Sequence, residues 1–330
     1  MNTLGKIFRI SVFGESHGPG IGVMIDGCPP GLAINGEMIL GDIDRRRSGK
    51  KGTTARKEYD MPEIISGVFK GVSTGAPIII MTRNTDKRSS DYDRFRSMPR
   101  PGHADMVARQ KYKGYADLRG GGYFSGRLTW GMVVAGSIAR LIIEPAKVQA
   151  RLVSAGGSTE VEKEINKALK QGDSIGGLIE CVASDVPAGL GEPLYYSAES
   201  AICQAVFSIP AIKGIEFGSG FRAASMKGSE HNDPIINKEG KTATNNAGGI
   251  NAGISNGNDI LLRVAVKPPS SISQPQETLN IDKDEMDILK VEGRHDACIA
   301  LRIPVIIEAA VSLALADLTL INRAIYGGIK

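Results

Sequence analysis

The stretches GVFKGVSTGAPIII (residues 67–80) and GINAGISNGNDILL (residues 249–262) place three glycines, a serine and a closing aliphatic run at identical spacing. An earlier pair, PPGL at 29–32 and PAGL at 187–190, stands in the same order. These two matches predict a chain of two related halves that join near residues 144–147. Because 41 of the 330 residues are glycine, a chance match of glycines is the alternative.

Along the rest of the chain, hydrophobic periodicity predicts strands that alternate with helices. The expected strands are 6–13, 21–26, 63–70, 77–82, 147–154, 178–184, 212–217 and 260–266. The expected helices are 35–46, 104–115, 125–143, 159–170, 198–207 and 304–326, with Asn35 as the cap of the first and a capping box at Thr159–Glu162. This alternation favours an α+β fold whose layers share one core. We expect a single domain over residues 1–330, with halves of about 1–145 and 146–330.

The apolar stretches are short or interrupted. The longest are 76–81, 131–143 and 303–321, and Glu308 and Asp317 interrupt the last. A membrane span needs roughly 18 uncharged residues in a row. The first nine residues are a polar lead into a strand and lack a signal-peptide core. We therefore expect a cytoplasmic protein without a membrane partner.

Four cysteines are scattered along the chain without CxxC spacing: Cys28, Cys181, Cys203 and Cys298. Scattered cysteines in such a protein are expected to be reduced and mostly buried. The sequence predicts no metal site.

Positive charge is concentrated in one part of the chain. Between Arg45 and Arg127 there are 19 Lys and Arg against 8 Asp and Glu, whereas the remainder has 21 against 28. Many of these arginines stand beside Gly, Ser, Pro or His in loop-like sequence, where the planar guanidinium suits phosphate and carboxylate. They indicate a pocket for small anions, and a solvated basic face is the alternative. The basic helix stripe and aromatic platforms typical of nucleic-acid binding are missing.

All four histidines, His17, His103, His231 and His295, lie in polar or Gly-rich sequence, and histidine is the natural proton carrier near neutral pH. The first lies in GESHG (residues 14–18), which matches the G-x-S-x-G nucleophile elbow of hydrolases. An elbow needs a helix directly after it, whereas a Pro-Gly turn and a second strand are expected here. The hydrolase interpretation is therefore disfavoured.

Three further segments could approach an anion. The glycines of 120–122 and 247–257 would let backbone N–H groups come close to a phosphate, although neither segment is a Walker A or Rossmann fingerprint. The segment 267–271 combines Lys with two Ser after a strand. Simple turns are the alternative for each of them. The residues together predict an enzyme that acts on a phosphorylated, polyanionic small molecule with His as acid.

Taken together, these clusters resemble the chorismate synthase family along the whole chain. The residues that carry the resemblance are FGESHG (13–18), DRRR (44–47), NTD (84–86) with DY (91–92), RPGHAD (100–105), RGGG (119–122), HND (231–233), KPPSS (267–271) and GRHD (293–296). The resemblance implies 1,4-anti elimination of phosphate from 5-enolpyruvylshikimate 3-phosphate to give chorismate. It implies reduced FMN (FMNH2) as cofactor, NADP as the associated dinucleotide and an external flavin reductant. It also implies a β-α-β sandwich with two pseudo-symmetric halves, assembled as a homotetramer.

The resemblance also implies roles position by position. His17 would protonate the departing phosphate, His103 would protonate the reduced flavin, and Asp296 would assist proton removal through flavin N5. The residues implied to hold substrate are Ser16, Arg46, Arg100, Ser125, Arg127 and Arg294. The residues implied to line the flavin are Tyr123, Phe124, Ser125, Pro210, Ala211, Ala252, Lys267, Pro268, Pro269, Ser270, Ser271 and Arg294.

The chain departs from the family pattern at a few positions. Tyr123 and Phe124 stand where the family has Arg and Ser against the flavin, and Gly52 stands where it often has Arg, so that Lys50 or Lys51 would substitute. Ala297 replaces the usual Pro, and Pro210 the usual Asn. A flavin-independent protein that binds a phosphate ligand on the same scaffold is therefore the alternative function.

Overall fold

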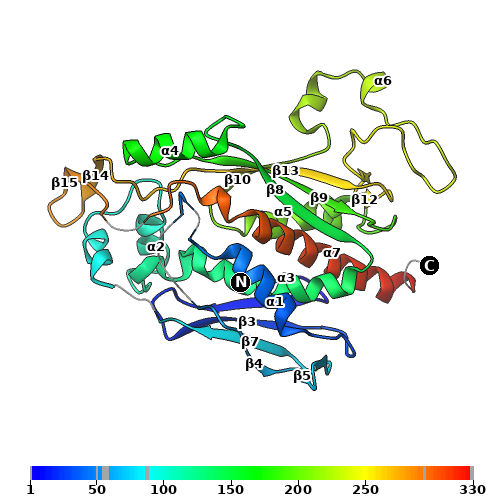
Figure 1. Cartoon of the computed structure of the whole chain (residues 1–330), viewed down its shortest axis with the longest axis horizontal. Coiled ribbons are helices and arrows are strands. Elements are labelled where there is room, and N and C mark those ends of the chain that lie inside the picture. Colours follow the sequence, from blue (N-terminus) through cyan, green and yellow to red (C-terminus); the bar gives the residue numbers. More distant parts are fainter. Residues whose placement is uncertain (1, 50, 54–58, 86–88, 293–294, 328–330) are drawn as a thin grey trace.

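Two antiparallel sheets enclose a middle layer of helices in the computed structural model, which describes residues 2–49, 51–53, 59–85, 89–292 and 295–327 (Figure 1). The lower sheet in Figure 1 has the order β1 (Thr3–Leu4), β2 (Arg9–Gly14), β3 (Gly20–Asp26), β7 (Ile78–Arg83), β4 (Glu63–Ser66). The upper sheet has the order β10 (Ile212–Phe217), β13 (Ile260–Val266), β9 (Gly177–Ser184), β8 (Lys147–Ala155). The helices between the sheets are α1 (Gly36–Arg46), α3 (Thr129–Ile143), α5 (Ala198–Phe207) and α7 (Pro304–Tyr326).

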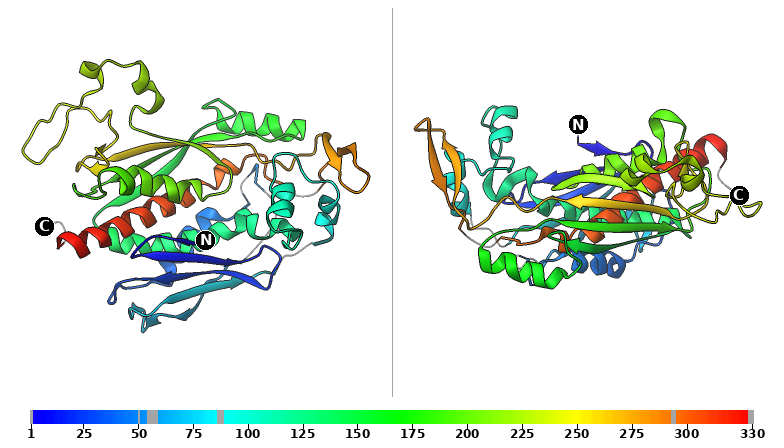
Figure 2. Two further views of the ribbon diagram at one scale, coloured as in Figure 1. Left: turned by 180° about the vertical axis from the view of Figure 1, so that it is seen from behind. Right: turned by 90° about the horizontal axis from the view of Figure 1, so that it is seen from above.

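The remaining elements decorate this sandwich. Helix α4 (Val161–Gln171) flanks the upper sheet next to its edge strand β8, and the segment with α6 (Gly228–His231) projects beyond the sheet, as Figure 2 shows. The other elements are α2 (Asp105–Lys111), the 3-10 segments η1 (Ser89–Arg96), η2 (Arg119–Phe124), η3 (Gly126–Leu128), η4 (Leu194–Tyr196), η5 (Gly220–Ser225) and η6 (Ile299–Leu301), and the hairpins β5 (Val68–Phe69)–β6 (Val72–Ser73), β11 (Ile250–Asn251)–β12 (Ile254–Ser255) and β14 (Gln276–Asn280)–β15 (Glu285–Leu289).

The core lies in the middle layer, where α3 and α7 are buried along most of their length. Each sheet turns one face toward it, so that Val23 and Ile25 of β3 are buried while Met24 between them is exposed. The two central helices come close enough that a Cβ added at Gly136 would lie 2.4 Å from the Cβ of Ala309. Glycine therefore sets the helix spacing that lets both sheets share one core.

The repeated sequence stretches fold in the same way. The strand orders β2-β3-β7-β4 and β8-β9-β13-β10 correspond, and each repeat forms a short hairpin before the third strand of its set. The Ser73 hydroxyl donates to Pro29 O at 2.7 Å, and the Ser255 hydroxyl donates to Pro187 O at 2.6 Å. Matching hydrogen bonds of this kind are not expected from a chance match of glycines. The predicted α+β sandwich with pseudo-symmetric halves is confirmed, and the boundary near residue 145 stays a prediction.

The strand predicted over residues 6–13 is β2, which begins at Arg9 rather than at residue 6. The backbone N–H groups of residues 6–8 donate to the carboxylate of Asp317 on α7, at 2.7 to 2.9 Å. These N–H groups therefore do not form hydrogen bonds with a neighbouring strand. This pairing spans more than 300 residues and leaves no local signal in the sequence.

Other boundaries also differ from the predictions. The capping box at residues 159–162 is wrong, because Glu160 occupies the cap position of α4 and its N–H donates to Ser158 Oγ. The helix expected over 104–115 ends at Lys111, since Lys113 and Gly114 have positive φ. The β14–β15 hairpin was not predicted.

By length and composition alone, residues 126–143 and α7 could cross a membrane. In this fold 83% and 72% of these segments are buried inside the protein. They are the two central helices of the sandwich, and buried core helices have this apolar composition as well.

The four cysteines are free thiols, and three of them are buried. Burial raises the pKa of the Cys28 thiol to about 11, which keeps it protonated and unreactive near neutral pH. The prediction of reduced, mostly buried cysteines is confirmed.

Helix α1 provides a first test of the link from sequence to site, because its last turn carries Arg45 and Arg46. Its cap is Asn35 as predicted, with the side-chain oxygen accepting from Glu37 N at 2.8 Å. Asn35→Ala is expected to lower the free energy of unfolding by about 1 kcal/mol, the usual contribution of such a cap. Urea unfolding measures the loss, and Asn35→Asp, which keeps the acceptor, is the matched control. Equal midpoints for the alanine variant and the parent would show that the cap contributes nothing.

Candidate active site

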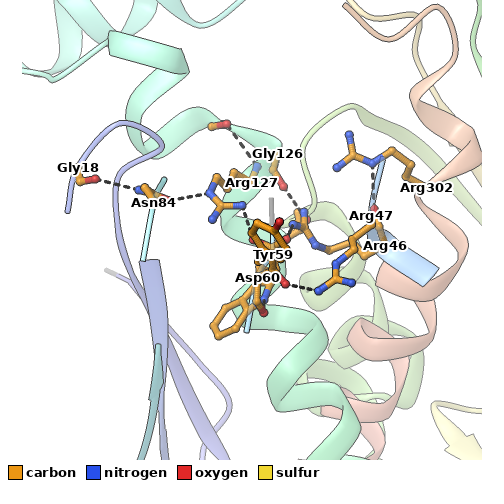
Figure 3. Close-up of polar contacts among 12 residues, drawn as sticks. Gly18, Arg46, Arg47, Tyr59, Asp60, Asn84, Gly126, Arg127 and Arg302 are labelled. Atoms are coloured by element: carbon orange, nitrogen blue, oxygen red, sulfur yellow. Dashed lines mark hydrogen bonds and ion pairs between the residues drawn. The ribbon is translucent and has the colours of Figure 1, made fainter. Parts of the chain in front are cut away.

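The loops that carry the predicted site meet at one end of the sandwich. Because the strands are antiparallel, the end of β2, the start of β3 and the end of β7 lie at the same end of the sheet. The end of α1 and the η3 segment before α3 reach this end of the sheet from the middle layer, and Figure 3 shows Arg46 and Arg127 pointing toward Asp60. The segment after β13 and the segment before α7 join them from the second half of the chain.

The turn that carries His17 is held from two sides. The Asn84 side chain donates to Glu15 O at 2.9 Å and to Gly18 O at 3.0 Å, and the Tyr92 ring packs edge-on against the His17 ring with centroids 5.3 Å apart. His17 itself is 6% exposed. This buried ring is therefore fixed in position before any ligand arrives.

Ser16 and Gly120 complete the surroundings of this histidine. Ser16 Oγ is fully buried and has no hydrogen-bond partner among the described residues. Gly120 has a φ of +62°, and a Cβ there would lie 2.4 Å from His17 Nε2. The position after Arg119 therefore requires glycine both for its backbone conformation and for the space beside the imidazole.

Two buried arginines share one buried carboxylate next to this turn (Figure 3). Asp60 accepts from Arg46 Nη2 at 3.0 Å and from Arg127 Nη1 at 2.7 Å, and all three side chains are buried. Arg127 Nε also donates to Asn84 Oδ1 at 2.7 Å, which links the pair to the His17 turn. These three described side chains together carry two positive charges and one negative charge, in a place that water hardly reaches.

Burial disfavours the charged form of a guanidinium. It lowers the pKa of the Arg46 guanidinium to about 10, with the charge of Arg302 adding to the effect and Asp60 opposing it. Arg302 lies close by, because its Nε donates to Arg46 O at 3.0 Å. An anion bound here would offset this cost, so the cluster favours an anionic ligand.

A second cluster surrounds His103. Its Nδ1 lies 2.7 Å from Asp105 Oδ1, and Arg100 makes a two-point ion pair with the same carboxylate at 2.8 Å for each contact. Burial alone would raise the pKa of Asp105, but the hydrogen bonds from Arg100 and His103 outweigh it and hold this pKa well below its usual range. Asp105 is therefore ionised at every pH of interest.

Arg100 connects the two halves of the chain. Its guanidinium lies over the Phe95 ring, 4.3 Å from the centroid, and Nη1 donates to Ser271 Oγ at 3.1 Å. The contacts that the structure gives this side chain are thus with the protein itself. Its implied contact with a substrate anion stays a prediction.

The segment 267–271 packs against the loop that carries His103. Lys267 Nζ donates to Gly102 O and to Ser270 Oγ, both at 2.7 Å, and Lys267 N donates to Ala211 O at 2.9 Å. Burial and the nearby charge of Lys213 lower the pKa of Lys267. The structure therefore brings together the residues implied to line the flavin from two segments: Pro210, Ala211, Lys267, Pro268, Pro269, Ser270 and Ser271.

Asp296 lies on the same side of the site. Arg302 Nη1 is 3.4 Å from Asp296 Oδ2, so Arg302 joins the implied proton acceptor to Arg46. Arg294 and Lys50 lie outside the described residues. The sequence did not point to Arg302 or Asp60, because neither residue stands in one of the motifs quoted above.

Two departures from the family pattern have a structural explanation. The Tyr123 hydroxyl donates to Val12 O at 3.1 Å, and the Phe124 ring packs edge-on against Tyr112 with centroids 6.1 Å apart. Ser125 accepts from Arg127 N at 3.3 Å and so begins η3. The two aromatic side chains thus anchor the loop to the protein, and the loop still presents Ser125 and Arg127.

Gly52 lies at the margin of the cluster, where its O accepts from Ala297 N at 2.9 Å next to Asp296, and Ala252 lies apart from it. Gly52 is buried with a φ of +91°, and a Cβ there would lie 2.6 Å from a methyl group of Ile165, so no larger side chain fits. Ala252 lies in the β11–β12 hairpin beyond the start of β13, whereas Lys267 follows the end of that strand. Within one chain, the structure therefore does not bring Ala252 to the other implied flavin residues.

The described residues contain no group of three or more His, Cys, Asp or Glu side chains that could hold a metal ion. A surface hollow of about 960 Å³ lies along α4, and one of about 390 Å³ lies near Gly218. Neither touches the clusters of buried charge described above, and the larger is lined by a single stretch of chain. The chemistry is therefore assigned to the buried charges and not to these hollows.

Comparison with known proteins gives one consistent result. Residues 8–320 match the family model for chorismate synthase. The chain is 55% identical over 324 residues to a chorismate synthase of Chitinophaga pinensis, covering 98% of both proteins. It is 44% identical over 356 residues to one of Archaeoglobus fulgidus, covering 98% of this chain and 99% of the relative. A crystal structure of a chorismate synthase matches with a TM-score of 0.75 at 27% identity, covering 96% of this chain and 93% of the other.

Proposed function

Since the chain belongs to the chorismate synthase family, we propose that its clusters of buried charge bind 5-enolpyruvylshikimate 3-phosphate beside reduced FMN. The overall reaction is the conversion of this phosphate ester to chorismate and phosphate. It is a carbon–oxygen lyase reaction of the shikimate pathway, which leads to the aromatic amino acids. The comparisons lend no support to the alternative of a flavin-independent binding protein.

One observation carries the proposal for the substrate. Arg46 and Arg127 are buried with a single shared carboxylate and lie beside the turn that holds His17. The substrate has one phosphate and two carboxylates, and buried guanidinium groups suit such anions. In a site shielded from water, each such ion pair is stronger than at the surface. Ser16 Oγ, buried without a partner among the described residues, offers a further hydrogen bond.

The residues present also fit a flavin phosphate. The segment 267–271 offers an ammonium and two hydroxyls, with Lys213 nearby. We infer that Ala211 and Lys267–Ser271 hold FMN, and that Tyr123 and Phe124 fix the loop without contacting it. When bound, reduced FMN supplies electron density to the reacting system and recovers it, so the reaction has no net redox change.

The roles of the protein's own side chains follow from their positions. His17 delivers a proton to the departing phosphate, because it is the histidine on the turn that Asn84 connects to Arg127. Arg46 and Arg127 stabilise the negative charge that develops on that phosphate. His103 holds a second proton next to Lys267–Ser271, and Asp296, oriented by Arg302, is the carboxylate that assists proton removal from the substrate.

The test is an anaerobic assay with 5-enolpyruvylshikimate 3-phosphate and dithionite-reduced FMN. We expect chorismate absorbance and phosphate to appear together, and to disappear when the reduced flavin is omitted. We further expect that NADPH with oxidised FMN does not sustain turnover without an external reductant. Substrate binding without turnover would overturn the proposed flavin chemistry, and turnover with NADPH alone would overturn the external reductant.

We also propose that the protein is cytoplasmic and assembles as a homotetramer. The outer face of the lower sheet supports self-association, because Phe13 and Met24 on adjacent strands are each 38% exposed. Figure 1 shows none of the described helices on that face. Exposed apolar surface of this kind is commonly buried between subunits. Sedimentation analysis that gave only a monomer at working concentration would contradict the tetramer.

A further inference from the structure

Beside His103 lies the carboxylate of Asp105, to which the proposed reaction assigns no role. Asp105 lies two residues away, is 3% exposed and accepts hydrogen bonds at both oxygens. The motif RPGHAD (100–105) contains both His103 and Asp105, but their spacing in sequence does not show whether the two side chains are in contact. In the structure they are, at 2.7 Å.

Two partners compete for Nδ1 of His103, since Arg100 Nη2 lies 3.0 Å away and Asp105 Oδ1 lies 2.7 Å away. A guanidinium only donates, so a bond from Arg100 would require an unprotonated Nδ1. That arrangement would set the nitrogen lone pair against the carboxylate at the shorter distance, and both would be electron-rich. Arg100 Nη2 already donates to Asp105 at 2.8 Å. The carboxylate therefore accepts a hydrogen bond from Nδ1–H of His103.

We propose that Asp105 is a positioning residue that holds His103 as the Nδ1–H tautomer and presents Nε2 as the proton-transferring atom. A hydrogen-bonded carboxylate also fixes the orientation of the ring. Among the described residues, Asp105 and Arg100 contact this ring, and Lys267 from the segment after β13 contacts the adjacent Gly102 O.

Asp105→Asn is the decisive variant, because the outcome follows from the hydrogen bonds. Oδ2 of Asp105 accepts from Arg100 N at 3.0 Å and from Arg100 Nε at 2.8 Å, so the amide oxygen is expected to take that position. The amide nitrogen then faces Nδ1 of His103 and donates to it. The ring is thereby forced into the Nε2–H tautomer, while the shape of the side chain is unchanged.

The first readout is nitrogen NMR of the histidine-labelled full-length protein, which is independent of flavin and of turnover. At a pH where His103 is neutral, we expect the Nδ1–H tautomer in the parent and the Nε2–H tautomer in Asp105→Asn. His103→Gln assigns the signals. Asp26→Asn, which alters a surface Asp–Arg pair with Arg9, is the matched control and should leave the tautomer unchanged. An Nε2–H tautomer in the parent would overturn the proposal, even if the variant failed to fold.

The second readout rests on the proposed function and uses the anaerobic assay. Removal of a general acid typically costs about 100-fold or more, so a correctly placed ring in the wrong tautomer is expected to lose about 30-fold in kcat with KM within about 3-fold. Asp105→Glu, which keeps a carboxylate, should recover part of the loss. A structural role alone would lower stability without this loss in kcat, and that result would overturn the proposal. An inactive parent with the expected tautomers would instead refute the proposed function and leave the positioning of His103 intact.

Discussion

Replacement of His17 by alanine is expected to lower kcat for chorismate formation at least about 100-fold, the usual scale for loss of a general acid. The phosphate leaves as an anion beside Arg46 and Arg127, and the proton from His17 completes its departure. Both arginines keep their shared carboxylate in the variant, so the substrate should still bind. The loss therefore belongs in kcat and not in KM.

The matched control is His231→Ala. His231 ends the short helix α6, which Figure 2 shows beyond the upper sheet, and it takes no part in the clusters around His17 and His103. Stopped-flow measurement of phosphate release under reduced flavin gives the rate, and calorimetric titration gives substrate affinity. Turnover of His17→Ala within a few-fold of the parent would remove His17 from the reaction. A matching loss in His231→Ala would show that the effect is not specific to the site.

The sequence could predict the fold because the fold repeats itself. Two copies of one glycine and serine pattern mark the same hairpin in each half, and the hydrogen bonds of Ser73 and Ser255 show why these residue types recur. Aliphatic runs then identify the core strands. Strand ends were harder to predict, because the first of them depends on Asp317 at the other end of the chain.

The sequence predicted which residue types form the site, but it did not predict which side chains pair with one another. His17, Arg46 and Arg127 stand in motifs, but the carboxylate that joins the two arginines does not, since Asp60 is 67 residues from Arg127 in sequence. Arg302 was missed for the same reason. Arg100 was interpreted as a substrate ligand because arginine suits anions. Whether its donors are already engaged by Asp105 and Ser271 is a matter of packing that no local pattern conveys.

Gly120→Ala is expected to lower kcat at least about 100-fold, although this residue carries no chemical group. The new methyl group would lie 2.2 Å from His17 Cδ2 and 2.4 Å from Nε2, so the ring must move. The turn that holds this ring is fixed by Asn84, and the ring meets Tyr92, which leaves it little room to move without loss of these contacts. A displacement of about 1 Å at a proton donor commonly costs about 100-fold in rate.

The adjacent glycine separates this effect from backbone strain. Gly121 has a φ of +82°, so alanine is as strained there as at Gly120, where φ is +62°. Its Cβ would lie 3.6 Å from the Cβ of Ser125, an ordinary contact. Both variants should lose about 1 kcal/mol of stability from the left-handed backbone, and only Gly120→Ala should lose its rate. If the two variants lost rate equally, strain in the loop would be the cause. If neither did, the imidazole of His17 would not need its observed position, and its role as the proton donor would fail with it.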